Sequence, residues 1–261
     1  MTLLVTLAAS AGAQRMQLEL RPRANDTLRM RLDQTIEVTG TRKGVVMKPV
    51  VTSLHMFSRA IVESSGQAES MILAVTDSVD VSSSDEHATA LATQTERELK
   101  GRQMRLRLAP DGTVGMANRG TDVPKEVNDL VSVMPASFPR DPVEVGGTWA
   151  REMPITSATT FGAPITGIVK AIFRLDSVSR AGDLAYVSMR GAVEPPPQLP
   201  AEQAMSGSVD GEIVVNRKRG WLSETRFLVH MSTSIPTLGE ARAPMQFRTK
   251  ITQHMRVLDR R

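Results

Sequence analysis

Histidine and the carboxylates are the first residues to examine for chemistry, and the four histidines are His55, His87, His230 and His254. None lies within four residues of another, so no local metal-binding motif forms. If residues 221–235 and 244–258 pair as a hairpin, His254 faces roughly Glu224, on the polar face of the sheet. Zinc sites need three or four convergent ligands. We therefore expect no metal and no cofactor.

Sequence motifs of common enzymes are missing from the chain. The string closest to a Gly-x-Ser-x-Gly nucleophile turn is Gly207-Ser208-Val209-Asp210-Gly211, whose serine is misplaced. Neither a phosphate-binding Gly-x-x-x-x-Gly-Lys nor a dinucleotide-binding Gly-x-Gly-x-x-Gly occurs. The nearby carboxylates Asp77 and Asp80 fit solvated surface positions. The sequence therefore predicts a protein that is not an enzyme.

The composition limits which binding partners and which cellular compartment we expect for the protein. The 261 residues carry 32 Lys or Arg against 28 Asp or Glu, and aromatic residues make up only 3%. Because the positive charge is diffuse and base-stacking side chains are few, we expect no nucleic-acid partner. A basic surface can instead approach anionic membrane headgroups. The absence of cysteine excludes disulfides, thiol catalysis and a cysteine-anchored lipoprotein.

An apolar run at the N-terminus ends in Ala11-Gly12-Ala13, just before the first charge at Arg15. This pattern resembles the second half of a secretory signal peptide with a small-residue cleavage site. No Lys or Arg precedes the run, so we expect a signal peptide over residues 1–13 that is truncated at its start. The mature domain would span residues 14–261 and be periplasmic or secreted. The alternative is a frayed apolar tail.

Apolar and polar residues alternate along much of the chain, which is typical of half-buried strands. One example puts Val169, Ala171, Phe173 and Leu175 on one face. Turn residues such as Asp111-Gly112 join consecutive strands, which favours antiparallel pairing. Two segments, 84–100 and 122–134, have helical spacing instead. We expect an α+β fold, a mostly antiparallel incomplete barrel of about ten strands with two amphipathic helices on its concave face.

The most distinctive string is Pro142-Val143-Glu144-Val145-Gly146-Gly147-Thr148-Trp149. It resembles a "PV-x-VG-x-x-W" motif of uncharacterised bacterial envelope proteins, a family of unknown function. The resemblance implies an architecture similar to lipoprotein-localisation factors and mycobacterial lipid carriers, and with it a hydrophobic ligand. It supplies no catalytic residue. A purely structural interpretation also fits, in which Gly146 and Gly147 form a tight turn and Trp149 anchors a strand in the core.

The inward positions of the C-terminal strands are the candidate ligand-binding residues. They are Phe173, Val187, Met189, Ile213, Val215, Phe227, Val229, Met231 and Phe247. They alternate with charged or hydroxyl residues, so one face of the sheet must be apolar. We expect an exported, non-enzymatic protein that binds a lipid or other apolar ligand in a cavity between sheet and helices. The alternative is a structural or protein-interaction module of the cell envelope with no small-molecule ligand.

Overall fold

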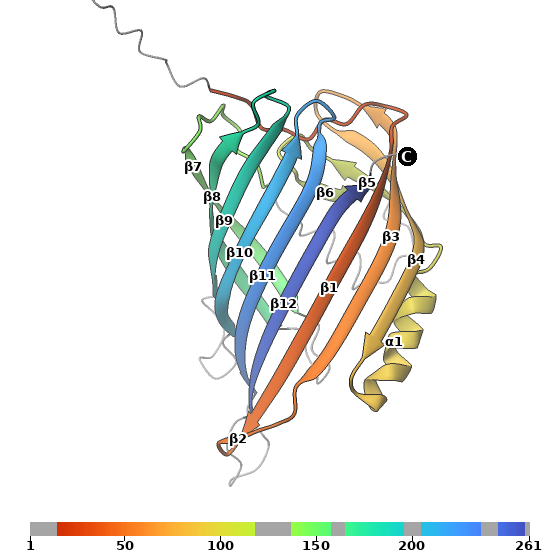
Figure 1. Ribbon diagram of the computed structural model, residues 1–261, viewed down its shortest axis with the longest axis vertical. Coiled ribbons are helices and arrows are strands. Elements are labelled where there is room, and N and C mark those ends of the chain that lie inside the picture. The colour runs from red at the N-terminus through yellow and green to blue at the C-terminus, as the bar shows by residue number, and fades with distance from the viewer. Residues whose placement is uncertain (1–14, 118–136, 158–164, 196–204, 236–244, 259–261) are drawn as a thin grey trace, which may run out of the picture.

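The computed structural model describes residues 15–117, 137–157, 165–195, 205–235 and 245–258. Twelve strands form one antiparallel sheet in these residues (Figure 1). The strands are β1 (Thr27–Arg42), β2 (Val45–Val46), β3 (Val50–Ser65), β4 (Ser70–Ser83), β5 (Gln103–Leu108), β6 (Val114–Met116), β7 (Thr148–Ser157), β8 (Ile165–Val178), β9 (Leu184–Glu194), β10 (Met205–Asn216), β11 (Trp221–Ile235) and β12 (Met245–Leu258). The helix described is α1 (Glu86–Leu99).

The strand order across the sheet is β6-β5-β4-β3-β1-β12-β11-β10-β9-β8-β7, and β2 pairs with β1. The first and the last strand of the chain therefore meet in the middle of the sheet. The sheet curls, so that β7 at one edge and β5 and β6 at the other lie behind the central strands (Figure 1). This curvature gives the sheet a convex face and a concave face, and the concave face forms a trough.

Alternation of residue types determines which side chains face the trough. In β8, Val169, Ala171, Phe173 and Leu175 are all at most 2% exposed. The residues between them, such as Lys170 and Arg174, are exposed on the other face. Tight turns join several strands, and Gly112 and Gly182 take the positive φ angles of 90° and 75° that these turns require. The predicted strand faces and turns are thus present.

The turn-rich end of the trough is filled by segments that are not strands. Residues 15–26 run across this end of the sheet and bury Leu18 and Leu20. The backbones of Met16 and Val143 exchange two hydrogen bonds of 2.8 and 2.9 Å. Phe138 is 1% exposed and belongs to the same core cluster. We call residues 15–26 together with Phe138 the plug, because they close one end of the trough.

The prediction of an α+β fold with about ten strands and two helices on the concave face is wrong. The structure has twelve strands. The predicted number was lower because β2 and β6 are too short to show a periodic pattern. The helix predicted over 84–100 exists as α1, but it packs mainly against β4 and lies near one edge of the sheet (Figure 1). The helix predicted over 122–134 lies outside the described residues, and so does the predicted signal peptide. Strands therefore dominate the described chain.

Candidate ligand-binding face of the sheet

The nine predicted ligand contacts share the concave face. The register links them across strands: Phe173 is opposite Met189, and Val187 is opposite Ile213. Six are buried by the chain itself, namely Phe173, Val187, Met189, Ile213, Val215 and Met231, with exposed fractions of 0–7%. The other three, Phe227, Val229 and Phe247, are partly buried. Their role as ligand contacts stays a prediction, and only these three present a partly exposed surface.

The strands in the centre of the sheet carry a second set of inward apolar residues that sequence reasoning did not select. These are Leu32, Ile36 and Val38 on β1, Leu54 and Met56 on β3, and Ile251 and Met255 on β12. All of them are only partly buried, although they lie in the middle of the sheet. In an ordinary core, the inward side chains of the central strands are the most deeply buried. Here the inward side chains of β8 to β10 are mostly buried, whereas those in the middle of β3, β1 and β12 are only partly buried.

The central apolar residues form continuous rows because the strands are in register. Ile36 on β1 is opposite Ile251 on β12, and Ile251 is in turn opposite Val229 on β11. Neighbouring side chains in such a row lie about 4.5–5.5 Å apart at Cβ and touch one another. We call the inward residues of β3, β12, β11 and β1 from Leu28 to Gly40 the central trough. Its middle part, which includes Ile36, Ile251 and Val229, is only partly buried.

A pair of amide side chains lies among the apolar residues of the central trough. Gln34 on β1 is directly opposite Gln253 on β12, and its Nε2 donates a hydrogen bond of 3.4 Å to the Oε1 of Gln253. Both amides are partly buried. A glutamine amide has two donor hydrogens and an acceptor oxygen with two lone pairs. One long hydrogen bond leaves most of this capacity for a polar group of a ligand.

The central trough carries no formal charge at its described positions. Inward residues fall on even numbers in β1 and β3 and on odd numbers in β11 and β12, and apart from the exposed Arg42 at the end of β1 each is apolar, a hydroxyl residue, glutamine or glycine. A cation does face inward on the edge strand β7, where Nη2 of Arg151 donates a 2.6 Å hydrogen bond to the carbonyl of Phe138. An unpaired charge is costly in apolar surroundings. The central trough therefore suits uncharged molecules.

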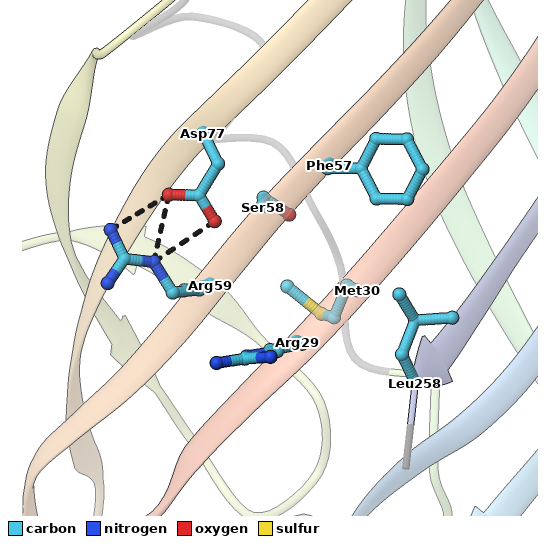
Figure 2. A pocket seen from close by; sticks show the side chains of 7 residues that line it. All are labelled: Arg29, Met30, Phe57, Ser58, Arg59, Asp77 and Leu258. Atoms are coloured by element: carbon cyan, nitrogen blue, oxygen red, sulfur yellow. Dashed lines mark hydrogen bonds and ion pairs between the residues drawn. The ribbon is translucent and has the colours of Figure 1, made fainter. Parts of the chain in front are cut away.

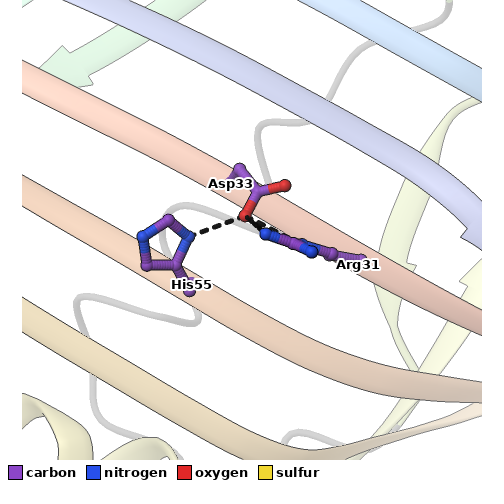
Figure 3. Close-up of polar contacts among 3 residues, drawn as sticks. All are labelled: Arg31, Asp33 and His55. Atoms are coloured by element: carbon purple, nitrogen blue, oxygen red, sulfur yellow. Dashed lines mark hydrogen bonds and ion pairs between the residues drawn. The ribbon is translucent and has the colours of Figure 1, made fainter.

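The convex face carries the charged side chains, arranged so that acids lie beside bases (Figure 3). Asp33 accepts a 2.8 Å hydrogen bond from Nη2 of Arg31 and contacts Nδ1 of His55 at 2.6 Å. Partial burial raises the pKa of Asp33, but the hydrogen bonds from Arg31 and His55 outweigh it and hold that pKa below its usual value. Such pairs stabilise neighbouring strands weakly.

The predicted proximity of His254 and Glu224 is confirmed, since Nε2 of His254 lies 2.6 Å from Oε1 of Glu224. Arg226 also contacts this carboxylate at 2.6 Å. Nowhere in the part of the chain that the structure describes do three or more His, Asp or Glu residues gather in a way that could hold a metal ion. The polar clusters of the convex face are therefore interpreted as structural ion pairs.

A hollow of about 420 Å³ opens where β1, β3 and β4 lie beside the end of β12 (Figure 2). It is lined by Arg29, Met30, Phe57, Ser58, Arg59, Asp77 and Leu258. Its Arg59 is paired with Asp77 at 2.8 Å. Its charged lining residues, Arg29, Arg59 and Asp77, belong to the convex side, and we assign no ligand to the hollow.

The turn before β7 has the geometry that the structural interpretation of the motif required. Gly146 has φ of 86°, and a Cβ at Gly147 would lie 2.5 Å from a methyl group of Val143. Trp149 stacks on Phe173, with ring centroids 5.6 Å apart and planes 7° apart. Its indole Nε1 donates a 2.9 Å hydrogen bond to the carbonyl of Ser137. Trp149 thus links β7 to β8 and to Ser137, the residue before Phe138 of the plug.

No family model matches the chain, and no curated protein matches its sequence. The fold is similar to a solved structure that describes lipid–protein interactions in lipovitellin, with a TM-score of 0.55 and 9% identity over 91% of this chain and 25% of that chain. The chain thus spans a quarter of the lipovitellin chain, and the likeness shows a shared fold alone. An outer membrane channel from Pseudomonas putida F1 aligns at 10% identity over 92% of this chain and 98% of that chain, but its TM-score of 0.22 is too low to support an argument.

The likeness to lipovitellin agrees in outline with the carrier-like architecture that residues 142–149 implied. The envelope family suggested by this motif stays a prediction. Among the described residues, no helix has the length and apolar character that a membrane crossing needs.

Proposed function

We propose that this chain is an exported, non-enzymatic protein that binds an uncharged apolar ligand, such as a lipid with a neutral polar group, in the central trough. The observation that carries the proposal is the partial exposure of a continuous apolar surface on the central strands, including Leu32, Ile36 and Ile251. Burying apolar surface yields roughly 25 cal/mol per Å². A ligand that covered this surface would recover free energy that the chain alone leaves unused.

The chemistry of the central trough supports an uncharged ligand over a fatty-acid anion. A carboxylate bound there would lose its hydration and would find no cation among the described inward residues of β3, β11, β12 and β1 from Leu28 to Gly40. Gln34 and Gln253 can instead offer hydrogen bonds to a hydroxyl or an ester group. The ligand class that fits is a lipid of low polarity with one or two such groups, for example a monoacylglycerol.

Two further observations support the proposal. The lipovitellin structure that shares the fold is described by its lipid–protein interactions. The small-residue pattern Ala11-Gly12-Ala13 after an apolar run supports export. In an envelope or secreted compartment, a binder of apolar molecules would keep them dispersed in water.

Binding of monooleoylglycerol and of oleate tests this function directly. We expect monooleoylglycerol to bind at least about tenfold more tightly than oleate above pH 8, where oleate is ionised. The double variant Ile36→Ser/Ile251→Ser should weaken monooleoylglycerol binding by about tenfold or more, because it makes one row of the central trough polar.

The matched control is Ile172→Ser, which changes an isoleucine that is 60% exposed on the convex face. It should leave binding unchanged, while circular dichroism confirms that all variants are folded. If the wild type binds neither lipid, or if the control weakens binding as much as the double variant, the proposal is wrong. The envelope interaction module without a small ligand would then be the better account.

A further inference from the structure

The hairpin formed by β1 and β2 carries the most exposed apolar cluster among the described residues. Val45, Val46 and Met47 follow one another and are 69%, 66% and 48% exposed. Three cations flank them, Arg42 and Lys43 on one side and Lys48 on the other, and all three are exposed. We call residues 42–48 the basic tip. Figure 1 shows it at the end of the molecule away from the plug.

The basic tip is an ordered hairpin, so its exposure is a property of the fold. Val45 pairs with Arg42 across the turn, and the amide of Met47 donates a 2.7 Å hydrogen bond to the carbonyl of Gly40. Lys43 and Gly44 both have positive φ, 50° and 79°, as the central residues of a type I′ turn do. The hairpin thus keeps the side chains of Val45 and Val46 exposed to solvent at a fixed position.

We propose that the basic tip docks this protein on an anionic membrane surface. Val45 and Val46 would enter the boundary between headgroups and acyl chains, while Lys43 and Lys48 reach the anionic headgroups with their flexible side chains. The charge around the tip favours this partner, because no acidic residue occurs between Glu37 and Glu63 in the sequence. Each cation near an anionic bilayer strengthens binding on the order of fivefold.

A bilayer fits the basic tip better than a protein groove does. The apolar residues form a short protruding point and not a face, and cations rather than a mixed polar rim surround them. Docking would orient the molecule so that the end of the trough opposite the plug faces the bilayer. That consequence rests on the proposed function, whereas docking itself does not.

Vesicle flotation tests the proposal with the whole chain. The probes are vesicles of phosphatidylcholine alone and vesicles with about 30% phosphatidylglycerol. We expect the wild type to bind the anionic vesicles at least about tenfold more tightly, and less so as salt is raised. Val45→Ser/Val46→Ser should weaken this binding by about tenfold or more, and Lys43→Gln/Lys48→Gln should remove most of the preference for anionic vesicles.

Two control variants separate the tip from the general surface. Ile172→Ser removes an apolar side chain that is 60% exposed, and Arg190→Gln removes a cation whose side chain is 90% exposed, both on the convex face. Both should bind anionic vesicles like the wild type, and a lipid-binding defect in the central trough should not alter vesicle binding. The proposal is overturned if the wild type does not bind anionic vesicles or if the tip variants bind them as well as the controls. It is also overturned if light scattering shows that the tip holds two copies of the chain together.

Discussion

Gln34 and Gln253 face each other across β1 and β12, the first and last of the described strands, and their amides are joined at 3.4 Å between apolar neighbours. Their neighbours along the strands are Leu32, Ile36, Ile251 and Met255. A polar pair in such surroundings either fixes the register of the two strands or contacts a polar group of a ligand. The two roles make different predictions.

We expect Gln34→Leu/Gln253→Leu to fold and to bind monooleoylglycerol about five- to tenfold more weakly, because the ligand's hydroxyl and ester groups lose their partners. Binding of an alkane-chain probe without polar groups should be unchanged or tighter. The convex-face variant Thr35→Val is the control, since Thr35 is exposed on the opposite side of β1. Calorimetric titration with both ligands checks this. An equal loss for both would mean that the pair acts on the fold.

Trp149 is expected to stabilise the fold without affecting the ligand. Trp149→Ala should lower the free energy of unfolding by about 2–4 kcal/mol, because it removes a partly buried ring stacked on Phe173. Trp149→Phe keeps the stacking and loses the hydrogen bond to Ser137, so its cost should be only about 1 kcal/mol. Urea unfolding measures both values. An unchanged midpoint for Trp149→Ala would contradict the role in packing.

Asp33 should make stability depend on pH in the acid range. Hydrogen bonds from Arg31 and His55 lower its pKa in the folded state. The carboxylate therefore contributes stability above its unfolded-state pKa of about 3.9, and this contribution is lost as the pH falls through the lower folded-state pKa. We expect Asp33→Asn to destabilise the protein by about 0.5–1 kcal/mol at pH 7 and by less at pH 3.

Urea unfolding at several pH values, with Asp141→Asn at an exposed loop position as the control, measures the effect of Asp33. A difference from the wild type that is as large at pH 3 as at pH 7 would show that the Asp33 carboxylate is not involved. The same result would assign the loss in Asp33→Asn to packing.

Local patterns in the sequence were enough to predict strand faces and the pairing of consecutive strands, but not the pairing of strands far apart in the sequence. The alternation of Val169, Ala171, Phe173 and Leu175 with polar residues predicts the buried face of β8, and burial confirms it. The pairing of β1 with β12 joins the two ends of the chain, and no local pattern specifies such a contact. The central trough could therefore not be recognised, although each of its strands could.

The predicted ligand contacts illustrate the same limit. Met189 and Val215 have the alternation of a ligand-facing strand, yet they are buried in the core cluster that also contains Leu18, Leu20 and Phe138 of the plug. Residues 16–22 of the plug do alternate, with Leu18 and Leu20 buried and Gln17 and Arg21 exposed, but alternation does not specify which part of the sheet such a segment covers. Gln34 and Gln253 were overlooked because a polar residue at an inward position looks like a break in the pattern. Their meaning depends on the register between distant strands.

The most direct test of ligand binding in the central trough uses the absence of cysteine from the chain. A single cysteine is placed at Ile251, which faces the trough, or at its neighbour Thr252, which is exposed on the convex face, and each is labelled with an environment-sensitive fluorophore. Monooleoylglycerol is then titrated into both proteins. The account predicts a saturable blue shift from the label at position 251 and none from the label at 252. Equal responses at the two positions, or no response at 251, would contradict a ligand site in the central trough.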